Sequence, residues 1–368
     1  MMKKKICIIG NSSWSIYNFR KELIVSLSSE YSIYICTPDL DSSKALQALG
    51  CEIVHLNLNR VSLNPLRELL TILQLRSISR RNNFTYILSY NIKPNIYSCL
   101  ACLFSKTKVV ANVSGLGSIM IANSIGSKIV SFIYRTSLIF SHFIFFQNNS
   151  DRELFLKKSF LNPRKSKVIP GSGINTESFE QNNYHLLRDN REINFAFIGR
   201  LIKDKGIIEY ITAAHYFKHN TNLFFNVCGT MDHNNPSSVH KDWLRANSSI
   251  NIKFFGHVNN IKDVLCKADC VILPSYREGM SRSLLEAASC GIPIITSNVP
   301  GCQEIVEDGH NGFLIAPGNS KSLIQAISRF IGLSREEIYA LGCNGAKKAR
   351  LHFSIEKVIN DYSKILKN

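Results

Sequence analysis

Residues 270–288 read CVILPSYREGMSRSLLEAA: a short, mostly β-branched apolar run, a loop with Pro, Gly and Ser, and a stretch with apolar residues at helical spacing. A brief apolar run bounded by turn residues is typical of a buried strand. The order strand, loop, helix predicts one unit of a parallel α/β sheet. Because open parallel sheets bind ligands at the carboxyl ends of their strands, the loop after Pro274 is a candidate binding segment.

The same alternation runs through the whole chain. In the first part, the apolar residues 127–146 read as a helix followed by a buried strand, and further strands are predicted at 6–9, 31–36, 53–56, 86–88 and 109–110. A second series supplies predicted strands at 193–198, 223–228, 252–255, 270–273 and 293–297. Two such series predict an α/β protein with two doubly wound, mostly parallel sheets.

Two domains of similar size are expected, because 368 residues exceed the length at which one hydrophobic core usually stops growing. The periodicity lapses over residues 175–191, which are polar and rich in Asn, so we place the linker there. The predicted domains are residues 1–178 and 179–368. The tail 334–366 is helical in pattern, and its last helix could return to the N-terminal domain.

The charge balance favours anionic partners. Lys and Arg number 44 and Asp and Glu 27, a formal net charge of +17, which suits phosphates, acidic lipid or nucleic acid. The basic residues are scattered in short groups, so we rank nucleic acid well below a phosphorylated small molecule. The apolar run 6–9 is too brief for a signal peptide, and Lys128, Arg135 and His142 break the segment 127–146, so neither stretch predicts a membrane span.

The eleven cysteines do not suggest a metal site. Cys99 and Cys102 are spaced as a pair, but no second pair completes a zinc set around them. We predict buried free thiols in a reducing compartment, with neither a disulfide nor a structural metal.

The loop that opens the helix after Pro274 could bind a diphosphate. Backbone N–H groups of Gly279, Met280 and Ser281 would point out of the helix N-terminus, where the macrodipole favours an anion. Glu278 in the loop and Glu286, two turns along the helix, could accept hydrogen bonds from sugar hydroxyls. Taken alone, each glutamate has a structural interpretation: Glu278 as a favourable anion near a helix start, and Glu286 as a surface residue paired with a nearby base.

A second strand-to-helix turn carries basic side chains. Arg200 and Lys205 flank the turn after strand 193–198 and could neutralise a diphosphate leaving group, Arg through its fork of donors and Lys as a point charge. The alternative is a solvated basic turn in which Asp204 caps the next helix.

Two single residues are weaker candidates. Gly10 follows the first strand without the full dinucleotide glycine fingerprint, and close packing of its loop would explain it. His257 follows strand 252–255 and could line a base pocket, although a lone His after a strand is often just a polar loop residue.

With these motifs the sequence resembles glycosyltransferase family 4, the retaining transferases of the GT-B fold, and specifically their bacterial surface-polysaccharide branch. The resemblance covers nearly the whole chain and rests on Gly199-Arg200 with Lys205-Gly206, the Glu278 to Glu286 segment, Tyr17-Asn18-Phe19-Arg20, Ile92 to Tyr97, Gly115-Leu116-Gly117 and Pro170 to Asn175. It implies two Rossmann-like domains facing across a cleft. The N-terminal domain would bind the acceptor and the C-terminal domain the nucleotide sugar.

The resemblance also implies roles at the donor site. Glu278, Arg200 and Lys205 are the predicted catalytic residues: the two basic residues would hold the donor diphosphate and Glu278 would face the transferred sugar. Glu286 would contact the ribose hydroxyls, within a predicted donor-binding set of Gly10, Gly199, His257, Gly279, Met280, Ser281, Leu284 and Glu286. Enzymes of this kind look as if they use front-face attack, with the acceptor proton passing to the departing phosphate. No protein nucleophile, metal or other cofactor is then expected.

The acceptor side is predicted at Asn112, Ser114, Gly115 and Gly117. Some family members carry a His before the glycine pair, whereas Asn112-Val113-Ser114 stand there in this chain. This departure leaves open which residue lies beneath the reacting sugar.

The predicted function is transfer of a hexose or N-acetylhexosamine from a UDP-sugar to a lipid-linked saccharide, in the synthesis of capsule, O-antigen or exopolysaccharide. The basic charge and the apolar N-terminal segments predict a cytoplasmic protein that is peripheral on the anionic inner face of the cell membrane. Two alternatives stay open: a nucleotide-sugar 2-epimerase of the same build, and a basic binding protein without activity.

Overall fold

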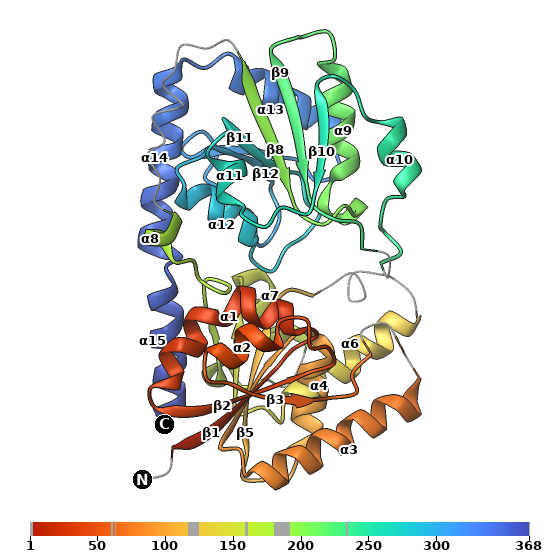
Figure 1. The fold of residues 1–368 in the computed structure, drawn as a ribbon, viewed down its shortest axis with the longest axis vertical. Helices are drawn as coiled ribbons and strands as arrows, with labels where there is room; N and C mark the ends of the chain where they lie inside the picture. Colours follow the sequence, from red (N-terminus) through yellow and green to blue (C-terminus); the bar gives the residue numbers. More distant parts are fainter. Residues whose placement is uncertain are drawn as a thin grey trace. The chain divides into compact units, whose positions relative to one another are not determined.

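The computed structural model describes residues 3–59, 62, 64–116, 125–158, 161–179, 192–232 and 235–367. The chain divides into two compact units (Figure 1). Unit 1 contains residues 1–173 and 355–368, and unit 2 contains residues 174–354. The division falls a few residues before the expected boundary at 178, and the last helix belongs to unit 1.

Unit 1 is built on seven parallel strands in the order β3-β2-β1-β4-β5-β6-β7. Their bounds are β1 (Lys4–Ile9), β2 (Tyr31–Thr37), β3 (Glu52–His55), β4 (Tyr86–Tyr90), β5 (Lys108–Val113), β6 (Phe143–Phe146) and β7 (Ser166–Val168). In β1, Ile8 lies opposite Ile35 of β2 and Leu88 of β4. These strands are apolar almost throughout because helices cover both faces of the sheet.

Each face of this sheet has its own core. One core is closed by α1 (Ser13–Ser28), α2 (Ser43–Ala48) and α15 (Ile355–Lys367). The other core is closed by α3 (Pro65–Asn82), α4 (Ile92–Ala101), α6 (Ile125–Leu138) and α7 (Asn149–Lys158). Helix α3 begins where it does because the Asn64 side chain accepts hydrogen bonds from the N–H groups of Leu66 and Arg67, with Pro65 at the first position.

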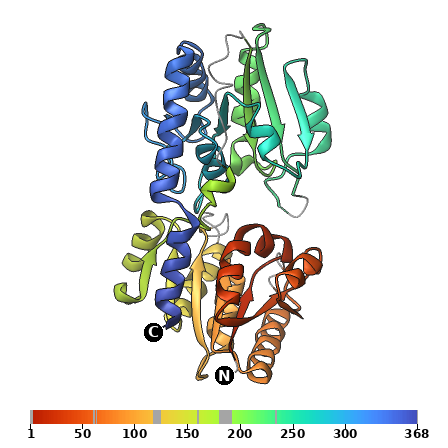
Figure 2. The same cartoon turned by 60° about the vertical axis from the view of Figure 1, so that its left-hand side comes forward.

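The C-terminal helix α15 is part of the core of unit 1 (Figure 2). Tyr362 is buried, its ring centroid lies 4.6 Å from that of Phe145, and its hydroxyl accepts a hydrogen bond from Asn112 at 3.2 Å. Gly173 has a φ of 69°, and a Cβ there would lie 2.7 Å from the Cα of Ile355. Only glycine combines that backbone conformation with so close an approach.

Unit 2 is built on six parallel strands in the order β10-β9-β8-β11-β12-β13. Their bounds are β8 (Ile193–Ile198), β9 (Leu223–Cys228), β10 (Ile252–Gly256), β11 (Cys270–Leu273), β12 (Ile294–Ser297) and β13 (Gly312–Ile315). One continuous core of aromatic and β-branched side chains surrounds this sheet.

The longer helices of unit 2 pack in pairs. Helix α9 (Ile207–Tyr216) packs against α13 (Ser320–Ile331), and α12 (Arg282–Ser289) packs against α14 (Arg335–His352). A capping box fixes the start of α14, in which Ser334 and Glu337 each accept a hydrogen bond from the other's backbone N–H. The shorter elements are α8 (Thr176–Phe179), α10 (Lys241–Ala246), α11 (Lys262–Leu265) and a 3₁₀ turn at Lys203–Lys205, with a further 3₁₀ turn at Pro163–Lys165 in unit 1.

The predicted α/β class with two doubly wound parallel sheets is confirmed. The segment 127–146 forms α6 and then β6, as expected, and no helix among the described residues is long and apolar enough to cross a membrane. The sequence analysis missed β7 and β13, which have three and four residues and carry little periodic signal. The expected linker contains α8, and its remainder, 180–191, lies outside the described residues.

Candidate active site

The predicted donor motifs lie at the carboxyl ends of two adjacent strands of unit 2, β8 and β11. From β8 the chain proceeds to β9 and β10 on one side of the sheet, and from β11 to β12 and β13 on the other. The strand order reverses between β8 and β11, and open α/β sheets bind ligands at such a switch point. Arg200 follows β8 and Glu278 follows β11, so the fold brings the two motifs to one place.

Backbone contacts hold these two loops together. The Tyr276 N–H donates to the carbonyl oxygen of Asp204 at 2.9 Å. Gly206 has a φ of 76°, and a Cβ there would lie 2.1 Å from the carbonyl oxygen of Pro274. Glycine is therefore required at this position, and the turn carrying Lys205 is fixed against the loop carrying Glu278.

Lys205 and Glu278 form an ion pair between the two loops. Lys205 Nζ contacts Glu278 Oε1, and Ser275 Oγ donates to the same oxygen at 2.6 Å. The charged side chains are only 19% and 10% exposed. Removing two charges from water is costly. The hydrogen bond from Ser275 and the contacts between the two loops hold this pair at the carboxyl ends of β8 and β11. Ser275 was not among the predicted site residues.

Arg200 also forms an ion pair, but it is more exposed than Lys205. Its Nη1 lies 2.7 Å from Asp232 Oδ2, and half of the Arg200 side chain remains exposed. Its guanidinium therefore keeps donors at the surface, where an anionic group could meet them. Asp232 follows β9 and was not predicted, because nothing in the sequence links it to Arg200 before the strand order is known.

The N-terminus of α12 differs from the expectation. The Ser281 N–H donates to the carbonyl oxygen of Gly301 at 3.1 Å, and Ser281 is 3% exposed, so that N–H does not point toward a ligand as predicted. Gly279 is buried and Met280 packs partly against the core. Gly301 has a φ of 83°, and a Cβ there would lie 2.6 Å from the backbone of Glu278. The loop at Gly301 thus packs closely against the turn that carries Glu278.

Glu286 lies in the second turn of α12 and is mostly buried. Its Oε1 accepts a hydrogen bond from Arg282 Nε at 2.9 Å, and its side chain is 15% exposed. Burial raises the pKa of Glu286, and the neighbouring Arg282 offsets that shift only in part. A partner base is present, as in the alternative interpretation, but the carboxyl group is not at the surface. Carboxyl groups whose pKa is shifted by burial are enriched at functional sites.

Three other predicted donor residues have different surroundings. The Gly199 N–H donates to the carbonyl oxygen of Cys228 at 3.0 Å, so it links the ends of β8 and β9. Leu284 has no exposed surface and belongs to the core, so its side chain cannot touch a ligand as it stands. His257 is exposed just after β10, at the same edge of the sheet as Arg200.

A buried carboxylate that the sequence analysis missed lies beside these loops. Glu209, in the first turn of α9, is 6% exposed and accepts a hydrogen bond from the Tyr276 hydroxyl at 2.8 Å. Burial, followed by the bond to Glu209, raises the pKa of Tyr276 to about 12. The only sequence signal for Glu209 is its position as the one glutamate in a mostly apolar helix.

The predicted acceptor residues lie in unit 1 and are not all accessible. Asn112, the next-to-last residue of β5, has no exposed surface, and its amide group hydrogen-bonds with Tyr362 and Gln147. Its side chain is therefore part of the interior of unit 1. Ser114 is half-buried in the loop after β5 and accepts from Asn91 at 3.5 Å. Gly115 has a φ of 103°, and Gly117 lies outside the described residues.

Gly10 serves close packing, which was the simpler of its two interpretations. A Cβ there would lie 3.1 Å from the side chain of Ile16 in α1. Arg20, from the motif 17–20, is 6% exposed and stacks 4.1 Å from the ring centroid of Tyr90 at the end of β4. Both residues therefore help to build unit 1.

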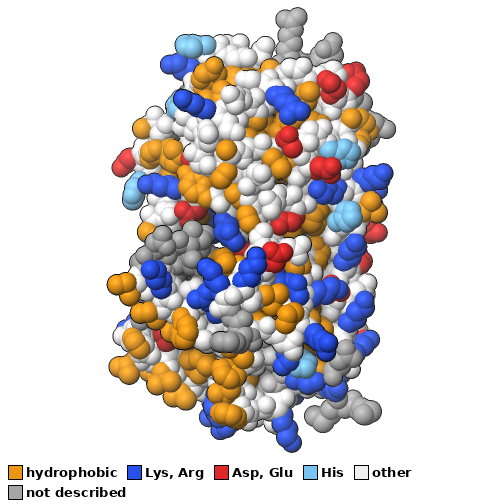
Figure 3. Space-filling view, turned by 180° about the vertical axis from the view of Figure 1, so that it is seen from behind, with side chains coloured by type: hydrophobic (Ala, Val, Ile, Leu, Met, Phe, Trp, Pro, Cys, Tyr) orange, Lys and Arg blue, Asp and Glu red, His pale blue; other side chains and the backbone are white. Residues whose placement is uncertain are grey.

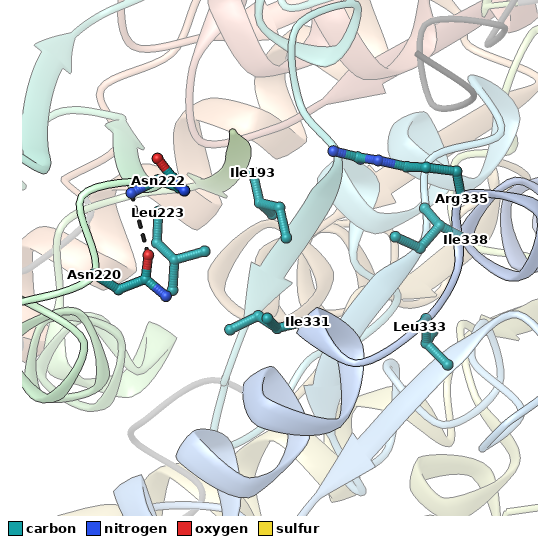
Figure 4. Close-up of a pocket in the computed structure, with 8 residues that line it drawn as sticks. All are labelled: Ile193, Asn220, Asn222, Leu223, Ile331, Leu333, Arg335 and Ile338. Carbon is teal, nitrogen blue, oxygen red and sulfur yellow. Dashed lines mark hydrogen bonds between the residues drawn. The ribbon is translucent and has the colours of Figure 1, made fainter. Parts of the chain in front are cut away.

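Each unit has a pocket. One, of about 330 Å³, is at the opposite edge of the unit 2 sheet, where Ile193 and Leu223 begin β8 and β9 (Figure 4). Its Arg335 is ion-paired with Asp269 at 3.1 Å, and most of its lining is aliphatic. The other, of about 680 Å³, follows β3 in unit 1 and has a mixed lining of polar residues, such as Asn57 and Gln74, and apolar ones, such as Leu56 and Leu58.

The eleven cysteines are free thiols. Cys99 and Cys102 are buried, and burial raises the pKa of both. Among the described residues, no group of three or more His, Cys, Asp or Glu side chains is arranged to hold a metal ion.

Known proteins share this architecture. A solved structure of HepE from Anabaena, in complex with UDP and glucose, has a TM-score of 0.80 at 16% identity, with 100% of both chains covered. A sucrose-phosphate synthase from Thermosynechococcus elongatus has a TM-score of 0.82 at 16% identity, with 99% of this chain and 98% of that chain covered. At these identities the likeness establishes the GT-B fold.

Proteins with similar sequences are also glycosyltransferases. An N,N'-diacetylbacillosaminyl-diphospho-undecaprenol alpha-1,3-N-acetylgalactosaminyltransferase from Campylobacter jejuni is 28% identical, with 99% of this chain and 100% of that protein covered. A UDP-Gal:alpha-D-GlcNAc-diphosphoundecaprenol alpha-1,3-galactosyltransferase from Escherichia coli is 26% identical, with 73% of this chain and 72% of that protein covered. The model for glycosyl transferases group 1 matches residues 178–347, and that for glycosyl transferase 4-like proteins matches residues 5–148. The chain thus belongs to the GT4-like glycosyltransferases of the GT-B fold, and it is an enzyme that transfers sugars.

Proposed function

We propose that this enzyme transfers a hexose or N-acetylhexosamine, with retention, from a UDP-sugar to a lipid-linked saccharide in bacterial surface-polysaccharide synthesis. The names of the Campylobacter jejuni and Escherichia coli relatives, which specify diphospho-undecaprenol acceptors, support the acceptor class. The solved HepE complex with UDP and glucose supports a uridine nucleotide. The reaction would take place at the cytoplasmic face of the membrane.

The observation that carries this proposal is the pair of basic side chains at the β8–β11 switch point. Lys205 is fixed beside Glu278, and Arg200 presents part of its guanidinium at the surface. Breaking the bond between the sugar and the diphosphate leaves negative charge on the departing UDP. Preorganised positive groups stabilise that charge without further rearrangement, which is the largest contribution in many enzymes.

The atoms balance without a protein nucleophile. The anomeric C–O bond to the diphosphate breaks, the acceptor oxygen bonds to the same carbon on the same face, and the acceptor proton moves to the departing phosphate oxygen. Glu278 would contact the sugar and Glu286 the ribose, while Arg200 and Lys205 would hold the diphosphate. These roles follow the family resemblance and fit the placement of the side chains in unit 2.

The test is Glu278→Gln, which keeps the size of the side chain and removes its charge. Turnover of a UDP-sugar should fall about 100-fold or more, as expected for loss of a group that acts in the transition state. The shift of the melting temperature by UDP alone should persist, because UDP lacks the sugar that Glu278 would contact. The matched control is Asp242→Asn, whose side chain is 93% exposed on α10.

Normal turnover by a folded Glu278→Gln protein would refute the role of this residue. The assay also separates the proposal from epimerisation: without acceptor, a 2-epimerase would convert the UDP-sugar into its epimer, whereas a transferase would release only hydrolysed sugar. A panel of nucleotide diphosphates in the same melting assay tests the base. A larger shift with GDP or ADP than with UDP would overturn the uridine assignment.

A further inference from the structure

Two helices of unit 1 carry a second apolar stripe that faces away from the core. On α3 the stripe consists of four leucines that are 51–73% exposed: Leu66, Leu69, Leu70 and Leu73. On α6 it consists of Ile125, Ile129, Phe132 and Ile133, which are 42–78% exposed. The spacings i, i+3, i+4, i+7 and i, i+4, i+7, i+8 each place their residues on one face of a helix.

These stripes are separate from the faces that build the fold. Helix α3 buries Thr71, Leu75 and Ser79 against the sheet, and α6 buries Tyr134 and Leu138. Both helices pack against α4, which is largely buried between them, so they lie on the same side of unit 1. In Figure 3, seen from behind, hydrophobic side chains gather along the margin of this unit where α3 and α6 lie.

Exposed apolar stripes on two helices that pack against the same third helix indicate a binding surface. Its charges indicate the partner. Helix α6 contains Lys128 and Arg135 and no acidic residue, and α3 contains Arg67, Arg76, Arg80 and Arg81. The one acidic residue of α3, Glu68, is ion-paired with Lys93 at 2.9 Å.

We infer that α3 and α6 form a docking surface for a bilayer that contains anionic lipid. Helices with an apolar face and basic flanks lie in the plane of the membrane interface, with the apolar side chains among the acyl chains and the basic ones at the head groups. Neither helix is long and apolar enough to span a membrane.

The surface would place unit 1 at the membrane that holds a lipid-linked acceptor. Arg67 and Leu70 of α3 also line the pocket after β3, so a bilayer lying on α3 would adjoin that pocket. The biological role of this membrane contact rests on the proposed function, but lipid binding can be measured without turnover. Failure of one therefore leaves the other intact.

The test uses the full chain and vesicles of phosphatidylcholine, with or without phosphatidylglycerol. The wild type should sediment with the anionic vesicles and be released by salt. Leu69→Ser combined with Phe132→Ser should lower the partition coefficient at least tenfold, since burying one such side chain contributes roughly a factor of ten. The control pair is Val25→Ser with Leu351→Ser, whose side chains are 54% and 53% exposed on α1 and α14.

Circular dichroism and donor hydrolysis should be unchanged in both double variants, because none of the four side chains lies at the donor site or in a core. Equal partitioning of the two double variants would overturn the inference. So would binding that ignores the phosphatidylglycerol content. A wild type that is dimeric in sedimentation velocity, with a monomeric Leu69→Ser/Phe132→Ser variant and no vesicle binding, would reassign the surface to a contact between copies.

Discussion

Glu286→Gln should separate ligand binding from stability in unit 2. The Glu286 pKa is raised by burial, so the ionised form costs folding free energy at neutral pH. That cost is present above the raised pKa and is relieved as the pH falls toward the unfolded value. Glutamine removes the charge, and its amide oxygen can still accept the hydrogen bond from Arg282. The melting temperature of the variant at neutral pH should therefore equal or exceed that of the wild type.

Binding of the donor should change in the opposite sense. If Glu286 accepts hydrogen bonds from the ribose, the substitution replaces a charged acceptor by a neutral one. Hydrogen bonds to charged groups contribute about 1.5–3 kcal/mol and those between neutral groups about 0.5–1.5 kcal/mol, so affinity should fall roughly 5- to 13-fold. In the wild type, affinity should likewise fall as the pH drops through the raised pKa of Glu286. A UDP-sugar is the suitable probe, because its diphosphate does not titrate in that range.

Isothermal titration calorimetry across pH and thermal denaturation of the same samples give both quantities. Asp242→Asn removes the same charge from an exposed position of unit 2 and should change neither. The reasoning is refuted if Glu286→Gln lowers the melting temperature by several degrees and leaves affinity unchanged. That result would make Glu286 a structural partner of Arg282 and no part of the donor site.

Two further predictions concern the scaffold. Gly206→Ala should lower the free energy of unfolding by about 2–4 kcal/mol, because a positive φ and a contact with the neighbouring loop both penalise a Cβ; Gly50→Ala, with a φ of 80° and no atom within 4 Å of its Cβ, should cost only about 1 kcal/mol in the same denaturant titrations. Tyr362→Ala should destabilise unit 1 by about 3–5 kcal/mol, since it empties a buried site and removes a partner of Asn112; an unchanged denaturation midpoint would show that α15 is not part of the core of unit 1.

The alternation of strands and helices could be predicted because each element carries its own period. The strand at 270–273 and the helix that follows it agree with β11 and α12 to within a residue or two. Short elements could not be found this way: the strand Ser166–Val168 has no room for a pattern. Its place is set by pairing with β6, a contact between segments that sequence reasoning does not bring together.

The motifs of the proposed donor site were also visible in the sequence, but their partners were not. Asp232 contacts Arg200 only because β9 and β8 are neighbours in the sheet. Ser275 contacts Glu278 within one loop, through a turn geometry that the sequence does not specify. The sequence likewise suggested free N–H groups at the start of α12, whereas Ser281 donates to the Gly301 loop. The stripe on α3 was hidden for a related reason: an amphipathic pattern shows that a helix has an apolar face, but not that it has two.

The two ion pairs at the switch point suggest how the site is kept ready for its substrate. Arg200 and Lys205 are paired with Asp232 and Glu278, so each basic group is held in place by a carboxylate. Without those partners, the two basic side chains would lose the fixed positions that the proposed stabilisation of a leaving group requires. A diphosphate brings two negative charges to the same place and can take over part of this role. Lys205 would then shift its pairing from Glu278 toward phosphate, which frees the carboxylate to contact the sugar. On the proposed function, donor binding would therefore offset part of the desolvation cost of this buried ion pair.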